Sequence, residues 1–242
     1  MAGSLIIIPT YKEKENIERM IRKVFSFAKA YHILVVDDNS PDGTADIVRG
    51  LIEEFGGKLF LETRAGKLGL GTAYIHGFKW ALARDYQYIF ELDADFSHDP
   101  NDLIRLYKTC AEEGYDLAIG SRYIAGVNVV NWPMSRVLMS YYASFYVRLI
   151  TRMKIRDTTA GFKCFKRSVL EAIDLDKVQF TGYAFQIEMK YLTWKLGFKI
   201  KEVSIVFTDR TAGVSKMSSG IFREAVFGVI KLRWQNLFKK NK

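Results

Sequence analysis

Hydrophobic residues in this chain form short runs that alternate with helical patterns. Five runs read as buried strands, and apolar residues between them recur every three or four positions, as in amphipathic helices. The predicted strands cover residues 4–10, 31–36, 58–61, 86–92 and 116–120. The predicted helices cover residues 17–28, 45–55, 71–84 and 101–113. This alternation predicts an α/β fold with a mostly parallel sheet covered by helices on both faces.

The second half of the chain is less regular. A long helix rich in aromatic and aliphatic residues is predicted over residues 132–153, and a second amphipathic helix over residues 185–196. A short strand is expected at 163–165 and a longer one at 198–207. The pattern thus divides the chain into one α/β domain, residues 1–218, and a basic amphipathic helix, residues 219–242.

Two carboxylates one residue apart follow the fourth predicted strand. Asp93 and Asp95 can face the same way, because side chains at i and i+2 of an extended segment share a face. Oxygen ligands of this kind suit a hard divalent cation such as Mg²⁺. Taken alone, the stretch 91–99 is better explained as a polar loop that caps a helix, since the motif is so short.

Two other polar clusters, residues 9–13 and 37–42, follow the first and second predicted strands. Ligands bind outside the carboxyl ends of parallel strands. We therefore expect these clusters to converge with Asp93 and Asp95 in one site.

Composition and charge narrow the classes of function. The 242 residues are 49% hydrophobic and 26% charged, with a net charge of +9 and a pI near 9.4, which predicts an anionic partner. No zinc-finger spacing, RNP-type motif or basic recognition helix supports a nucleic-acid-binding protein.

Cys110 and Cys164 are expected to be reduced core thiols. The N-terminal apolar run stops at Pro9, unlike a signal peptide, and the longest uncharged stretch, 137–147, is too short to span a membrane.

Taken together, the motifs resemble those of family 2 inverting glycosyltransferases with the GT-A fold. Within that family they are most similar to the dolichyl- or polyprenyl-phosphate mannose synthases without transmembrane helices. The motifs that carry the resemblance lie at residues 9–13, 35–44, 67–74, 93–100, 120–123, 131–133, 157–162 and 210–216.

The resemblance implies an activity, partners and a location. It implies inverting transfer of mannose from GDP-mannose to dolichyl or another polyprenyl monophosphate, with Mg²⁺ or Mn²⁺ as cofactor. The enzyme would be peripheral on the cytoplasmic face of the plasma membrane or endoplasmic reticulum, and a separate membrane-anchoring subunit stays an open alternative. A donor such as UDP-glucose is the alternative within enzymes, and a basic nucleic-acid-binding protein is the alternative from another class.

The resemblance also assigns roles to individual residues. It implies catalytic roles for Asp93, Asp95, Arg122 and Asp157, and metal binding by Asp93, Asp95 and Ser97. It implies nucleotide-sugar binding by Pro9, Tyr11, Glu13, Val36, Asp38, Asp93, Ala94, Asp95, Arg122, Arg210 and Lys216. It implies lipid-phosphate binding by Arg122, Arg136 and Ser140. Guanidinium groups suit these roles because they bind phosphate oxygens in a bidentate manner.

The residues themselves leave some of these roles open. Glu13 fits a helix start as well as a nucleotide contact. Asp157 could orient the sugar or an arginine, or cap a turn. The three histidines, His32, His76 and His98, share no ligand spacing and are expected to be structural.

The glycine-rich segment 66–71 lacks the spacing of a phosphate-binding loop. It predicts instead a tight turn that opens a helix and brings two backbones close together.

Helix 132–153 and the terminal helix have apolar residues flanked by arginine and lysine. This pattern fits contact with an anionic bilayer surface. It fits equally a pair of helices that pack on the sheet as part of the core.

Overall fold

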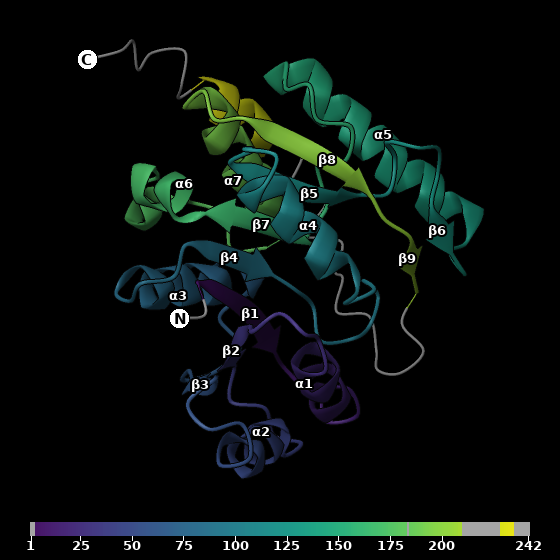
Figure 1. The fold of residues 1–242 in the computed structure, drawn as a ribbon. Coiled ribbons are helices and arrows are strands. Elements are labelled where there is room, and N and C mark those ends of the chain that lie inside the picture. Colours follow the sequence, from purple (N-terminus) through teal and green to yellow (C-terminus); the bar gives the residue numbers. More distant parts are fainter. Residues whose placement is uncertain (1–2, 183, 210–227, 235–242) are drawn as a thin grey trace.

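The computed structural model describes residues 3–182, 184–209 and 228–234 (Figure 1). The strands are β1 (Ser4–Thr10), β2 (His32–Asp37), β3 (Leu59–Thr63), β4 (Tyr88–Glu91), β5 (Leu117–Ser121), β6 (Val129–Val130), β7 (Lys163–Lys166), β8 (Ile200–Ser204) and β9 (Phe207–Thr208). The helices are α1 (Ile17–Phe25), α2 (Thr44–Ile52), α3 (Leu70–Leu82), α4 (Asp102–Ala111), α5 (Met134–Thr151), α6 (Arg167–Ala172), α7 (Ala184–Lys195) and the 3-10 helix η1 (Leu175–Lys177). The predicted alternation of strands and helices is confirmed.

Seven strands form the central sheet, in the order β3-β2-β1-β4-β7-β5-β8. β7 runs antiparallel to its neighbours β4 and β5, and the other pairs are parallel. The mostly parallel sheet predicted from the sequence is therefore confirmed, with β7 as its one inserted antiparallel strand.

The single long strand predicted at 198–207 is wrong. The chain forms β8 beside β5, and the N–H of Ile205 still donates to the carbonyl of Ser121. β5 ends at Ser121, so the residues after Ile205 have no strand of the central sheet to pair with. The chain then forms β9, which pairs with β6 in a separate two-stranded sheet.

Alternate residues of each central strand point to opposite faces of the sheet. Leu5 and Ile7 of β1 belong to one core cluster, with side chains of α3, α6 and α7. Ile6 and Ile8 belong to the other, with side chains of α1, α2 and α4. Helices thus cover both faces, as predicted, and the central strands are buried on both sides (Figure 1).

The two cysteines lie inside the core. Cys110 and Cys164 are free and fully buried, and the Cys110 Sγ lies 3.3 Å from the Cys164 carbonyl oxygen. This agrees with the expectation of reduced core thiols.

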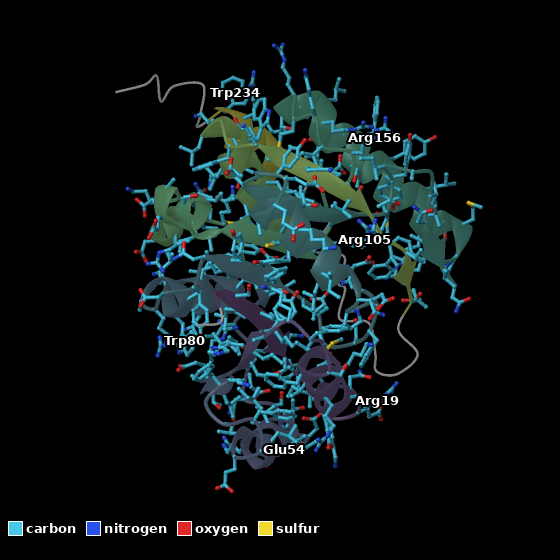
Figure 2. The ribbon with its side chains drawn as sticks, viewed as in Figure 1. Arg19, Glu54, Trp80, Arg105, Arg156 and Trp234 are labelled. Carbon is cyan, nitrogen blue, oxygen red and sulfur yellow. The ribbon has the colours of Figure 1, made fainter. Side chains whose placement is uncertain are left out.

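Part of the predicted terminal helix is described. Residues 228–234 are helical, and Val229 and Leu232 pack into the core cluster beneath α3 and α7. Ile230 and Trp234 are exposed, and Trp234 is labelled in Figure 2. The described part therefore packs on the domain through one face, and the predicted boundary at residue 219 lies outside the described residues. None of the described helices has the length and apolarity to cross a bilayer.

The glycine-rich segment before α3 forms the predicted tight turn. Gly69 has a φ of +102°, which favours glycine, and the Gly71 N–H donates to the carbonyl of Thr181 at 2.8 Å. A Cβ on Gly71 would lie 2.7 Å from the carbonyl oxygen of Phe180. The close backbone approach predicted from the sequence is confirmed.

Gly77 lets α3 pack directly on the sheet. A Cβ added there would lie 2.7 Å from Cγ2 of Ile7, in the middle of β1. We expect Gly77→Ala to lower the free energy of unfolding by about 1–2 kcal/mol, because overpacking outweighs the gain in helix propensity. Chemical denaturation of the purified variant measures this.

Gly50→Ala is the matched control for that substitution. Gly50 is also helical, and a Cβ there would meet no atom within 4 Å. Alanine should therefore stabilise the protein at that position, by up to about 1 kcal/mol. Equal stabilisation by both substitutions would contradict the packing that we describe for Gly77.

Candidate active site

Loops from the first two parallel strands meet at one edge of the sheet. The backbone N–H of Lys12, after β1, donates to the Ser40 Oγ at 3.0 Å, and that of Glu13 donates to the Thr44 Oγ1 at 3.1 Å. The predicted convergence of residues 9–13 and 37–42 is therefore confirmed. β4 lies on the other side of β1, and its carboxyl end adds the segment with Asp93 and Asp95 to the same edge.

The acids of the second cluster have different tasks. Asp37 is fully buried and accepts hydrogen bonds from the hydroxyls of Thr10, at 2.8 Å, and Ser40, at 2.6 Å. Asp42 accepts from the hydroxyl of Thr44 at 2.6 Å. Asp37 and Asp42 therefore stabilise the conformation of the loops through hydroxyl groups. Asp38 differs from them because it contacts an arginine.

Asp38 forms an ion pair with Arg64, a residue that the sequence analysis missed. The Arg64 Nε donates to the Asp38 Oδ1 at 2.6 Å, and the N–H of Leu68 donates to the other carboxylate oxygen at 3.2 Å. Burial raises the pKa of Asp38 above its usual value, although the Arg64 guanidinium opposes the shift. Arg64 directly follows β3, so the strand-end rule could have found it.

The other expected nucleotide-binding residues differ in how they are exposed. Tyr11 is half-buried, and the Lys67 ammonium lies 5.2 Å from its ring centroid. Glu13 accepts a hydrogen bond from the amide of Asn16 at 3.1 Å, as a helix-start residue would. The Val36 side chain lies wholly in the core, so only its backbone is available to a ligand.

Asp93 and Asp95 lie just beyond β4 with unequal exposure. The Asp93 side chain is 39% exposed, whereas Asp95 is 8% exposed and accepts a hydrogen bond from the Ser97 N–H at 3.0 Å. The Tyr74 hydroxyl lies 3.4 Å from the Asp93 Oδ1. Ala94, between the two acids, is buried.

The oxygens of this segment fit a hard divalent cation. Ser97 is buried, and its Oγ has no hydrogen-bond partner among the described residues. This oxygen is therefore available as a metal ligand. The described ranges contain no group of three or more His, Cys, Asp or Glu that could hold a metal by themselves. Two carboxylates and a hydroxyl match the few protein ligands that Mg²⁺ uses when phosphate oxygens complete its shell.

His98 closes one side of the acidic pair. It is buried between the rings of Phe162 and Phe207, and its Nδ1 lies 3.9 Å from the Asp93 Oδ2. Burial lowers the pKa of His98 to about 4, so the ring is neutral at physiological pH. Its place between two rings fits the expected structural role.

Arg122 and Asp157 form a buried ion pair at the carboxyl end of β5. Asp157 accepts from the Arg122 Nε at 2.7 Å, from its Nη2 at 2.6 Å and from its backbone N–H at 2.9 Å. Burial alone would raise the pKa of Asp157, but the Arg122 charge and hydrogen bonds hold it below its usual value. Of the three roles left open for Asp157, orientation of an arginine is the one that the geometry favours.

Trp132, for which the sequence analysis gave no role, connects Arg122 with Arg136. The Arg136 guanidinium lies 4.1 Å from the Trp132 ring centroid and that of Arg122 lies 5.4 Å from it. Arg136 also donates to both carboxylate oxygens of Asp209, at 2.9 and 3.0 Å. The two predicted phosphate-binding arginines are thus brought together, with Ser140 one turn further along α5. Arg210 and Lys216 lie outside the described residues.

Phe207 links this arginine pair to the acidic pair. Its ring centroid lies 5.1 Å from that of His98, and the Arg122 guanidinium lies 5.7 Å from it. The N–H of Thr208, the next residue, donates to the Ser97 carbonyl at 3.0 Å. β9 therefore fixes the distance between the acidic loop and the arginines.

α5 leaves an apolar face uncovered by the described residues. Only Ser144, Val147 and Thr151 of this helix are buried. Exposed apolar residues recur every three or four positions along its length and define what we call the α5 apolar face: Met134, Leu138, Tyr141, Tyr142, Phe145 and Leu149. The alternative that this helix packs on the sheet as part of the core is therefore wrong for most of its length.

Two characterised proteins are similar to nearly the whole chain. A polyprenol monophosphomannose synthase of Mycolicibacterium smegmatis is 45% identical over 226 residues, which cover 93% of this chain and 85% of that protein. An undecaprenyl-phosphate mannosyltransferase of Micrococcus luteus is 43% identical over 237 residues, or 96% of each chain.

Solved structures with the same fold are more distant in sequence. A mannosyltransferase of Pyrobaculum calidifontis, in complex with GDP-Man and Mn²⁺, aligns with 99% of this chain at a TM-score of 0.63 and 17% identity. This chain spans 65% of that protein's length. A glucosyl-3-phosphoglycerate synthase of Mycobacterium tuberculosis, in complex with Mn²⁺ and UDP-glucose, aligns with 99% of this chain and 80% of its own at a TM-score of 0.68 and 16% identity.

These comparisons agree with each other and with the fold. The structural neighbours and the mostly parallel, helix-covered sheet show the GT-A fold. The family described as Glycosyl transferase family 2 matches residues 5–174. The chain belongs to glycosyl transferase family 2.

Proposed function

We propose that this protein transfers mannose, with inversion, from GDP-mannose to dolichyl or another polyprenyl monophosphate. The observation that carries the proposal is the position of the α5 apolar face. It begins at Met134, beside Trp132 and Arg136, and Phe207 connects these residues to the acidic pair. A lipid phosphate could thus lie on α5 with its charged end at the arginines. The two relatives at 43–45% identity, named for mannose transfer to polyprenyl phosphates, support the same acceptor and sugar.

The acceptor needs little proton chemistry. A phosphate monoester has a second pKa of about 6, so its attacking oxygen is already anionic at neutral pH. The obstacle is electrostatic, because this anion approaches a sugar that is attached to another anionic group. Arg122 and Arg136 would offset that repulsion, and Asp157 keeps the Arg122 guanidinium in one orientation.

The donor would bind across the carboxyl ends of β1, β2 and β4. Asp38, held by Arg64, and the ring of Tyr11 would border the nucleoside, together with Pro9, Glu13 and the backbones at Val36 and Ala94. Arg210 and Lys216 would close over the diphosphate. Mg²⁺ or Mn²⁺, held by Asp93, Asp95 and Ser97, would neutralise charge on the departing diphosphate.

The acceptor implies that the protein works at a membrane surface. We propose peripheral contact through the α5 apolar face, on the cytoplasmic side of the plasma membrane or endoplasmic reticulum. A separate membrane-anchoring subunit could share that contact. The basic residues that flank the face, Arg136, Arg148 and Arg152, suit anionic headgroups.

The choice of donor and acceptor is tested by a panel of nucleotide sugars with polyprenyl phosphate in detergent. We expect turnover with GDP-mannose and formation of a polyprenyl-phosphate mannose product, measured by mass spectrometry. Turnover with UDP-glucose and none with GDP-mannose would overturn the proposed donor. No turnover with any lipid phosphate would overturn the acceptor.

The role of the acidic pair is tested by Asp93→Ala and Asp95→Ala. We expect each variant to weaken Mn²⁺-dependent binding of GDP-mannose by roughly tenfold or more, because the cation would lose a charged oxygen ligand. Isothermal titration calorimetry with and without Mn²⁺ measures it. Asp85→Ala, at an exposed position after α3, is the control with the same change of charge. Unchanged metal-dependent binding in both test variants would contradict the proposed site.

The membrane contact is tested with Met134→Ser/Leu138→Ser. Both side chains are exposed on the α5 apolar face, so we expect roughly tenfold weaker binding to neutral phosphatidylcholine vesicles in a flotation assay. Ile104→Ser/Leu196→Ser removes two exposed apolar side chains from α4 and from the residue after α7 and should bind as the parent does. Equal binding by all three proteins would argue against contact through α5.

A further inference from the structure

In the segment that follows α5, residues 152–156, the solvent-exposed side chains are all cations. Between Thr151 and Asp157, buried and exposed residues alternate, with Met153 and Ile155 buried. The exposed positions are basic: Arg152, Lys154 and Arg156. Glu202 holds the segment in place by accepting the backbone N–H groups of Arg156, at 2.7 Å, and of Asp157, at 2.8 Å.

Two of these cations, Lys154 and Arg156, border a pocket that also has apolar walls. Its volume is about 450 Å³. Arg156, one of its lining residues, is labelled in Figure 2. The residues that line it define what we call the α5 basic pocket: Phe145, Arg148, Leu149, Met153, Lys154 and Arg156. Phe145 and Leu149 also belong to the α5 apolar face, so the pocket opens onto that face.

The cations of the pocket form no ion pair with the described residues, and the Arg156 Nη1 donates instead to the Ile124 carbonyl at 3.1 Å. No carboxylate of the described chain forms an ion pair with Arg148, Lys154 or Arg156, and the Arg148 Nε is buried without a hydrogen-bond partner there. Glu202, the acid that contacts this segment, uses both carboxylate oxygens on backbone N–H groups. Seven arginines of the described chain pair with acids: Arg22, Arg49, Arg64, Arg105, Arg122, Arg136 and Arg167. Arg19 and Arg84 instead lie over the rings of Phe96 and Trp80.

We infer that the α5 basic pocket binds the headgroup of an anionic phospholipid. Arg148, Lys154 and Arg156 would contact the phosphate, and the acyl chains would continue over Phe145 and Leu149. The apolar half of the lining favours a lipid over a soluble anion or a nucleic acid. This inference rests on the proposal that the α5 apolar face meets the membrane.

The lipid in this pocket would not be the acceptor. Arg136 and Arg148 are twelve residues apart on one helix, which separates them by about 18 Å along its axis. One phosphate cannot contact both, so α5 would hold the acceptor phosphate near its first turn and a bilayer lipid near its last. Two such contacts would orient the helix on the membrane and make binding depend on anionic lipid.

The test compares flotation with vesicles of phosphatidylcholine alone and of phosphatidylcholine mixed with phosphatidylglycerol. We expect Arg148→Gln/Lys154→Gln/Arg156→Gln to lose roughly a hundredfold in binding to the anionic vesicles, since each basic residue near such a surface contributes about fivefold. Its binding to neutral vesicles should stay as in the parent protein. Thermal unfolding checks that the variant is folded.

A matched control separates the pocket from the net charge of the protein. Lys58→Gln/Lys108→Gln/Lys199→Gln removes the same charge from exposed positions elsewhere on the domain and should keep most of the anionic-lipid binding. Equal losses in both triple variants would overturn the inference in favour of net charge alone. Competition by glycerophosphoglycerol or inorganic phosphate as strong as by the lipid would overturn it in favour of a soluble anion.

Mannose transfer in detergent distinguishes this inference from the proposed function. The pocket variant should retain transfer to polyprenyl phosphate in micelles, because its substitutions lie away from the acidic pair and from Arg136. Loss of that transfer together with unchanged vesicle binding would mean that the pocket belongs to the acceptor site, and would overturn the inference.

Discussion

The buried pair of Arg122 and Asp157 is the interaction on which the rest of the site depends. Asp157 has no exposed surface, and its carboxylate holds both the side chain and the backbone of Arg122. Removing one partner of such a pair costs about 3–5 kcal/mol, because the other charge is left buried alone. The pair connects the end of β5 to the segment after α5, so it fixes where α5 lies relative to the sheet.

A second set of buried charges links α7 to the segments that carry the site. Lys163 pairs with Glu91 at 3.0 Å, and the amide of Gln186 donates to the same Glu91 oxygen at 2.8 Å. Lys190 lies four residues after Gln186 on α7. It donates to the carbonyls of Thr158, at 2.9 Å, and Ala160, at 2.6 Å. One face of α7 thus holds both the strand that carries the acidic pair and the loop that carries Asp157. Burial lowers the pKa of Lys190 well below its usual value, which is the cost of placing a cation there.

The domain combines a hydrogen-bonded sheet edge with a helix that the described residues leave largely exposed. Side-chain hydrogen bonds hold the loops after β1, β2 and β4, whereas the described part of the domain buries only Ser144, Val147 and Thr151 of α5. This division suits an enzyme whose donor is a soluble nucleotide sugar and whose acceptor lies in a bilayer. In the proposed function, the donor would meet preorganised polar groups, and the lipid would meet the apolar surface of α5.

The sequence by itself determined the α/β fold and the meeting of the strand-end polar clusters at one edge of the sheet. Hydrophobic period separates strands from helices, and parallel strands must end at a common edge, so the convergence of Asp38, Asp93 and the loop after β1 followed from local pattern alone. The close approach at Gly71 followed from glycine spacing in the same way. These features depend on neighbours in the chain, which a sequence displays directly.

Only the tertiary structure decided which partner each buried charge has and which apolar face the described residues leave exposed. Arg64 pairs with Asp38 across two strand ends, β7 enters between β4 and β5 in the opposite direction, and β9 leaves β8 for β6. The apolar period of α5 showed that the helix has an apolar face but not whether anything covers it. Periodicity records the direction in which a side chain points from its own element, whereas cover and charge pairing depend on residues far away in the sequence.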